Sequence, residues 1–140
     1  MIRKAACLIA IGFILVPITG KAQVANKEKA AVSAAEKWLG LIDAGQYSRS
    51  WEEAATFFRN AVSQEKWEQS LSAVRKPLGG WVSRQVETKK YSTSLPGAPD
   101  GEYVVMKFAT SFTHKKSAIE TVTFMLDKDG KWRAAGYFIR

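Results

Sequence analysis

The sequence predicts an α+β fold in which three N-terminal helices pack on one face of a four-stranded antiparallel meander sheet. Apolar residues recur at helical spacing before the Gly79-Gly80 pair and at a spacing of two residues after it. Turn-forming residues then divide the second half of the chain into segments of strand length. The 140 residues are 46% hydrophobic and 24% charged, which is an ordinary globular composition.

Three helices are expected before Gly80. Their ranges are 27–44, from Ser48 or Ser50 to about residue 59, and from Ser63 up to Pro77. Gly45 suits a left-handed C-terminal cap of the first helix, because glycine adopts positive φ without steric cost. The segment Ser50–Glu53 has the spacing of a capping box, which favours a helix start there.

Four strands are expected after Gly80, over residues 81–92, 102–114, 118–127 and 131–140. The first strand alternates poorly and carries Arg84, Lys89 and Lys90, as is typical of an edge strand. Asp127–Lys131 fits a three-residue hairpin loop with Gly130 in the left-handed conformation.

These loops set a register that gathers large apolar side chains on one sheet face. A loop over residues 115–117 places Phe108 beside Phe124, and the last hairpin places Leu126 beside Trp132. The face then holds Met106, Phe108, Phe112, Val122, Phe124, Leu126, Trp132 and Phe138. A one-residue slip would scatter these side chains over both faces, so this register is favoured, and the helices should cover this face.

The N-terminus has the pattern of a secretory signal peptide. A basic start precedes the apolar run Ala5–Thr19, and Gly20-Lys21-Ala22 supplies small residues at the two positions that a signal peptidase reads. We expect cleavage before Gln23, which leaves one domain over residues 23–140 in the periplasm or outside the cell. The alternative is an uncleaved anchor, but the run is short for a membrane span. No stable span is expected after cleavage, and export removes nucleic acid as a natural partner.

The expected mature chain offers few groups for metal or nucleophilic chemistry. Cys7 leaves with the signal peptide, and His114, the sole histidine, lies beside two lysines in a predicted turn. No ligand set for zinc or calcium and no phosphate-binding loop is present in the sequence, so we expect no metal and no cofactor. The sequence therefore favours a non-catalytic domain over an enzyme.

Glu120 is the one weak candidate for a catalytic residue. The expected register places it on the apolar face between Phe112 and Phe138. Burial there would disfavour its charged form, which suits a general acid or base. Alternatively, Glu120 lies near the end of the sheet and reaches water or a helix N-terminus. A roomy cavity around it with a second polar group would favour catalysis, and a filled core would favour a binding or structural role.

The opposite sheet face is expected to expose Lys107, Arg133 and Tyr137. The expected register places Lys107 and Arg133 in one cross-strand row, with Tyr137 two rows away across small side chains. Such a surface suits a flat or anionic partner, because the arginine can form charge-assisted hydrogen bonds. The alternative is an ordinary half-polar outer face, as antiparallel sheets commonly show to water.

One long segment and several short ones resemble a known family. The segment Tyr91–Val105, with the sequence YSTSLPGAPDGEYVV, resembles the central signature of the bacterial "domain of unknown function 4019" family. The shorter matches are Gly45–Tyr47, Ser50-Trp51, Arg75–Gly79, Thr110–Phe112, Glu120–Thr123, Asp129–Arg133 and Gly136–Phe138. The resemblance implies a small exported domain without an established activity, and its order of elements is similar to cystatin-like and nuclear-transport-factor-like folds.

The sequence therefore predicts an exported cell-envelope domain, either a binding or a protein-interaction module. Its expected partner is an envelope protein or an anionic envelope component. After cleavage the chain has 18 basic against 13 acidic side chains, a net charge of +5 that is spread along the chain. The alternative is that these charges form an ordinary solvated surface. The alternative function is a small enzyme with a sheet-lined pocket that uses Glu120 as its acid or base.

Overall fold

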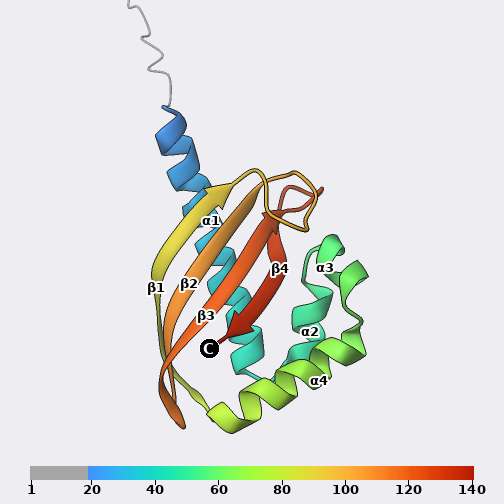
Figure 1. The fold of residues 1–140 in the computed structure, drawn as a ribbon, viewed down its shortest axis with the longest axis vertical. Coiled ribbons are helices and arrows are strands. Elements are labelled where there is room, and N and C mark those ends of the chain that lie inside the picture. The colour runs from blue at the N-terminus through green and yellow to red at the C-terminus, as the bar shows by residue number, and fades with distance from the viewer. Residues whose placement is uncertain (1–18) are drawn as a thin grey trace, which may run out of the picture.

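The computed structural model describes residues 19–140, in which helices precede a four-stranded antiparallel sheet. The helices are α1 (Gly20–Asp43), α2 (Tyr47–Glu52), α3 (Thr56–Ala61), α4 (Gln64–Arg75) and the 3-10 helix η1 (Lys76–Leu78). The strands, in chain order and in sheet order, are β1 (Trp81–Ser92), β2 (Tyr103–Phe112), β3 (Lys115–Leu126) and β4 (Trp132–Ile139). Helix α1 contacts all four strands, and α2–α4 gather beside β4 (Figure 1). The predicted α+β class and the meander are confirmed.

The second predicted helix is in fact two short helices, α2 and α3. Ala54 and Ala55 between them are fully buried, and Ala55 has extended backbone angles. The N–H group of Ala55 donates to the carbonyl oxygen of Ala134 in β4 at 2.8 Å. A continuous helix would have kept that N–H within the helix, so docking onto β4 interrupts it.

The ends of the other helices follow from local chemistry. The hydroxyl of Ser63 accepts a hydrogen bond from the Lys66 N–H at 3.3 Å, which confirms the predicted cap of α4. Gly45 adopts φ 75° after α1, as predicted for a left-handed cap. Helix α1 begins at Gly20 rather than at Lys27, so the expected cleavage point before Gln23 lies inside it.

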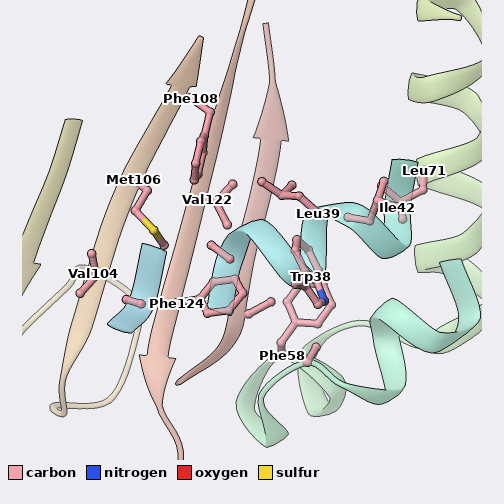
Figure 2. Close-up of a cluster of buried hydrophobic side chains, with 14 of the residues drawn as sticks. Trp38, Leu39, Ile42, Phe58, Leu71, Val104, Met106, Phe108, Val122 and Phe124 are labelled. Atoms are coloured by element: carbon pink, nitrogen blue, oxygen red, sulfur yellow. The ribbon is translucent and has the colours of Figure 1, made fainter. Parts of the chain in front are cut away.

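The hydrophobic core lies between α1 and the inner face of the sheet. Figure 2 shows side chains of β2 and β3 directed toward α1, with Trp38 beside Phe58 and Phe124. Met106, Phe108, Phe112, Val122 and Phe124 are all buried, which confirms that this is the helix-covered face. The prediction was wrong for Phe138, which is 49% exposed.

The predicted β2–β3 register was wrong by four residues. Phe108 pairs with Glu120, and Val104 rather than Phe108 pairs with Phe124. The turn between the strands is Thr113-His114 rather than residues 115–117, and it is anchored on the glycine pair. His114 N–H donates to Leu78 O, and Thr113 N–H donates to Gly80 O, both at 2.9 Å. A slip by an even number keeps every side chain on its face, so the predicted core still holds.

A β-bulge changes the second half of β4. The pairs Leu126–Trp132 and Phe124–Ala134 are as predicted, but Thr123 then pairs with Gly136, so Ala135 is an extra residue in β4. Beyond the bulge the alternation is reversed. Tyr137 pairs with Val122 on the inner face, and Phe138 pairs with Thr121 on the outer face.

Most of the predicted signal peptide, residues 1–18, lies outside the described residues. Within residues 19–140, no helix combines the length and the apolar character that a bilayer span requires.

Candidate functional site

Glu120 lies on the inner sheet face with none of its surface exposed. It comes from the middle of β3, where the residues on either side along the same face are Ala118 and Val122, both buried. The alternative that Glu120 reaches water is therefore wrong. An isolated charge at such a site would be strongly destabilising, so its hydrogen-bond partners decide what the residue does.

Three donors hold the Glu120 carboxylate. Oε1 accepts from Arg84 Nε at 2.7 Å and from Thr110 Oγ1 at 2.5 Å, while Oε2 accepts from the Tyr137 hydroxyl at 2.5 Å. The donors come from β1, β2 and β4, so every other strand of the sheet contributes one. Both carboxylate oxygens are occupied.

The same arginine also binds Asp43 at the end of α1. Arg84 Nη1 and Nη2 donate to the two oxygens of Asp43 at 2.7 and 2.9 Å, in a bidentate pair. Arg75, the last residue of α4, donates to Asp43 Oδ1 at 2.8 Å, and its guanidinium lies 4.8 Å from the centre of the Phe112 ring. We call Asp43, Arg75, Arg84, Thr110, Glu120 and Tyr137 the buried charge cluster; its formal charges cancel.

Burial and charge shift the pKa values of two members of this cluster. Burial alone would lower the pKa of Arg84, but its hydrogen bonds to Asp43 and Glu120 outweigh burial and raise the pKa above its ordinary value. Burial, together with the negative charge of Glu120, raises the pKa of the Tyr137 phenol. Both groups are thus fixed in their ordinary protonation states, the arginine charged and the tyrosine neutral.

The cluster has the properties of a structural network rather than of a catalytic site. A general base must reach a substrate proton, and Glu120 is fully buried with both oxygens occupied. A surface hollow of about 470 Å³ is lined by Arg84 and Thr110, but Glu120 is not part of its lining. Among residues 19–140, no three histidine, cysteine or acidic side chains are grouped so that they could hold a metal ion.

Arg75 has hydrogen-bonding capacity to spare. It is 5% exposed, and its Nε and Nη1 atoms have no hydrogen-bond partner among the described residues. Buried donors of this kind are usually satisfied by an ordered water molecule.

The three predicted surface residues do not share one face. Lys107 is exposed on the outer face, in one row with Thr121 and Phe138. Tyr137 lies on the inner face, where its ring is 5.9 Å from that of Trp38. The bulge at Ala135 causes this difference. Arg133 is four residues along β3 from the row of Lys107, opposite Met125.

Arg133 belongs instead to a hollow beside the β3–β4 hairpin. Its guanidinium donates to Asp129 Oδ2 at 2.6 Å and to the carbonyl oxygen of Glu53, after α2, at 3.3 Å. The hollow encloses about 330 Å³ between α1, the end of α2 and the start of β4. Its lining includes Lys37, Trp38, Glu53, Lys131, Trp132 and Arg133, and we call it the hairpin hollow.

Sequence reasoning missed Arg84 as the ion-pair partner of Glu120, and it missed Asp43 and Arg75 as further members of the buried charge cluster. Arg84 was interpreted as a solvent-facing charge on an edge strand, whereas its side chain is 7% exposed. One signal was present in the sequence. A charged glutamate on an apolar sheet face needs a cation as its partner, and Arg84 is a basic residue in another strand of the same sheet. Nothing in the local pattern of Asp43 or Arg75 separates them from ordinary helix-end charges.

The fold and the cluster define a small α+β domain whose sheet is joined to its helices by buried ion pairs. The family described as "Protein of unknown function (DUF4019)" matches residues 34–137, and the chain belongs to this family. The resemblance found in the sequence is thereby confirmed. No curated protein and no solved structure matches the chain.

Proposed function

We propose that this protein is an exported, non-catalytic binding domain of the cell envelope. The observation that supports this best is the state of Glu120, the one candidate acid or base. Its carboxylate is fully buried and held by three donors, so the residue serves to join β1, β2 and β4. The enzyme alternative requires a Glu120 that contacts substrate.

Charge supports an anionic ligand or partner. Residues 23–140 contain 18 basic and 13 acidic side chains, a net charge of +5, while the buried charge cluster is neutral, so the excess of positive charge lies elsewhere in the chain. Lys37, Lys107 and Lys131 are exposed, and no ion pair in the described part of the chain includes them. Unpaired surface cations raise the local concentration of anions and steer them toward the protein.

Export is tested by the mass of the protein recovered from the cell envelope. We expect a chain that begins at Gln23 and carries no lipid. A recovered species that retains residues 1–22 contradicts cleavage, and a protein found only in the cytoplasm contradicts export.

Binding and catalysis are separated by incubating the purified protein with an envelope extract. We expect one class of small anion to be retained in stoichiometric amount and released unchanged when the protein is denatured. Time-dependent conversion of an extract component by the wild type would instead contradict the non-catalytic proposal. Such conversion is assigned to Glu120 only if it is lost in a Glu120→Gln variant whose circular dichroism spectrum shows that it is still folded.

A further inference from the structure

We infer that the hairpin hollow is a ligand site for a small anion that has a planar apolar body. This inference rests on the proposed function and names the place and the chemistry of binding. The hollow encloses about 330 Å³, at the lower end of the range for small-molecule pockets. A single ring system fits that space, whereas a folded protein or a polysaccharide does not.

The walls of the hairpin hollow supply an apolar surface. Trp132, at the start of β4, lines the hollow and is only partly buried. The lining also includes Ala34 and two buried aromatic residues, Trp38 and Phe124, which are 4% and 1% exposed, so Trp132 supplies the accessible aromatic surface. Aromatic side chains of this kind stack favourably on a flat ring.

The rim of the hollow is positively charged. Lys37 of α1, Lys131 and Arg133 contribute three cations, against the single carboxylate of Glu53. Glu53 is already paired, because its Oε1 accepts from Arg49 Nε at 3.1 Å. Arg133 is paired with Asp129 at 2.6 Å and with Asp127 at 4.0 Å, whereas no ion pair in the described part of the chain includes Lys37 or Lys131.

This combination selects for both parts of the ligand. The lysines lie on different elements, α1 and the β3–β4 loop, on the rim of one hollow. A carboxylate or phosphate placed at the rim can form charge-assisted hydrogen bonds while the apolar body contacts Trp132. A neutral ring lacks the charge contacts, and a small inorganic anion lacks the apolar contacts.

The test measures the binding of 2-naphthoate to the full chain by isothermal titration calorimetry. We expect saturable binding with one site per chain. The neutral analogue 2-naphthalenemethanol should bind at least about tenfold more weakly, and acetate should give no measurable heat of binding. Affinity should fall as salt is added, because the rim lysines are exposed and therefore screened.

Matched variants locate the site. Lys37→Ala/Lys131→Ala should weaken binding at least about tenfold. The control is Lys29→Ala/Lys66→Ala, which removes the same charge from exposed positions outside the hollow and should leave affinity unchanged. Trp132→Leu should weaken binding, whereas Trp81→Leu, which removes a 47% exposed tryptophan at the start of β1, should not.

The outcomes are separable from those of the proposed function. Absence of naphthoate binding, equal affinity for the neutral analogue, or full affinity in the Lys37/Lys131 variant overturns the assignment of this site. If the protein still retains an anion from the envelope extract, the proposed binding function stands without this site. Chemical conversion of naphthoate would overturn the non-catalytic proposal itself.

Discussion

The hydroxyl group of Tyr137 in β4 donates a hydrogen bond of 2.5 Å to Glu120 Oε2 in the neighbouring strand β3, in the interior of the protein. The contact exists because the bulge at Ala135 turns Tyr137 inward, while Glu120 faces inward by the regular alternation of β3. It closes a chain of hydrogen bonds that runs from Arg75 through Asp43, Arg84 and Glu120. Local strand geometry thus decides whether the buried carboxylate is satisfied.

Glu120→Gln should be strongly destabilising. The amide retains the size of the side chain but leaves Arg84 buried with one carboxylate partner fewer. Breaking a buried ion pair typically costs about 3–5 kcal/mol of unfolding free energy. Urea unfolding followed by circular dichroism measures this. The control is Glu87→Gln, at an exposed position of β1, which should stay within about 0.5 kcal/mol of wild type. Equal stability of the two variants would contradict the buried ion pair.

Tyr137→Phe should change the alkaline limit of stability. Burial and Glu120 raise the pKa of Tyr137, while an unfolded tyrosine titrates near about pH 10. Above that pH the unfolded chain loses the phenolic proton and the folded chain keeps it. The contribution of Tyr137 is therefore fully present below about pH 10 and is lost as the pH rises further.

The measurement is unfolding free energy between neutral pH and pH 11. At neutral pH the loss of a hydrogen bond to a carboxylate should cost Tyr137→Phe about 1.5–3 kcal/mol. Above about pH 10, the unfolding free energy of Tyr137→Phe should fall less steeply with pH than that of the wild type. Tyr91→Phe is the comparison: the hydrogen bond from its phenol to Glu102 at 2.9 Å also raises the pKa of Tyr91, but the side chain is partly exposed, so this variant should lose less of the pH dependence than Tyr137→Phe. If Tyr137→Phe and the wild type showed the same pH dependence, the phenol of Tyr137 in the wild type would ionise as readily in the folded chain as in the unfolded chain.

Trp132→Ala should cost less stability than Trp38→Ala. Trp38 is 4% exposed, and its Nε1 donates to the carbonyl oxygen of Ser50 at 2.8 Å, so its removal should cost about 3–5 kcal/mol. Trp132 is only partly buried, because it lines the hairpin hollow, and its removal should cost less than about 3 kcal/mol. Thermal unfolding of the two variants measures both losses. A larger loss in Trp132→Ala than in Trp38→Ala would contradict the placement of Trp132 in the wall of the hairpin hollow.

Gly79→Ala should destabilise the protein more than Gly45→Ala. Both glycines have positive φ, 73° and 75°, but Gly79 combines it with ψ −158°, a backbone region that essentially only glycine adopts. A Cβ at Gly79 would lie 2.0 Å from Thr113 Oγ1, whereas a Cβ at Gly45 meets nothing within 4 Å. We expect an additional loss of about 1–3 kcal/mol at Gly79, as for overpacking in a tight site. Similar melting temperatures of the two variants would contradict the close packing of the β2–β3 turn against Gly79.

Much of the fold could be predicted because its signals are local. The Ser63 cap, the positive φ of Gly45 and Gly130 and the inner-face position of Met106 and Phe124 each depend on a few neighbouring residues. The turn residues also gave the Leu126–Trp132 pair correctly. The division of the second predicted helix into α2 and α3 was not predicted, because it depends on a hydrogen bond between Ala55 and Ala134 that no local sequence pattern encodes.

The candidate site could be predicted only at Glu120. A single glutamate among alternating apolar residues is visible in a sequence, but Ala135 resembles any other strand residue, so the bulge that reverses Tyr137 and Phe138 gave no signal. Asp43 and Arg84 are brought together only by the docking of α1 on β1. Their pairing is a property of the assembled fold.

The wide sequence separation of the ion pairs has a consequence for folding kinetics. Asp43 and Arg84 are 41 residues apart, and Arg84 and Glu120 are 36 apart. These contacts form only once α1, β1 and β3 have docked, so we expect them to be largely absent from the folding transition state. Glu120→Gln should then accelerate unfolding and leave the folding rate nearly unchanged.

The same ion pairs also discriminate between strand alignments. Sliding β3 along β2 by two or four residues keeps every apolar side chain on the inner face, so hydrophobic burial alone tolerates such errors. It would carry Glu120 away from Arg84 and Thr110, however, and leave a carboxylate without donors in the interior. The misaligned chain is then penalised by an unpaired buried charge, and the native alignment is selected among alternatives that the apolar pattern treats as equivalent.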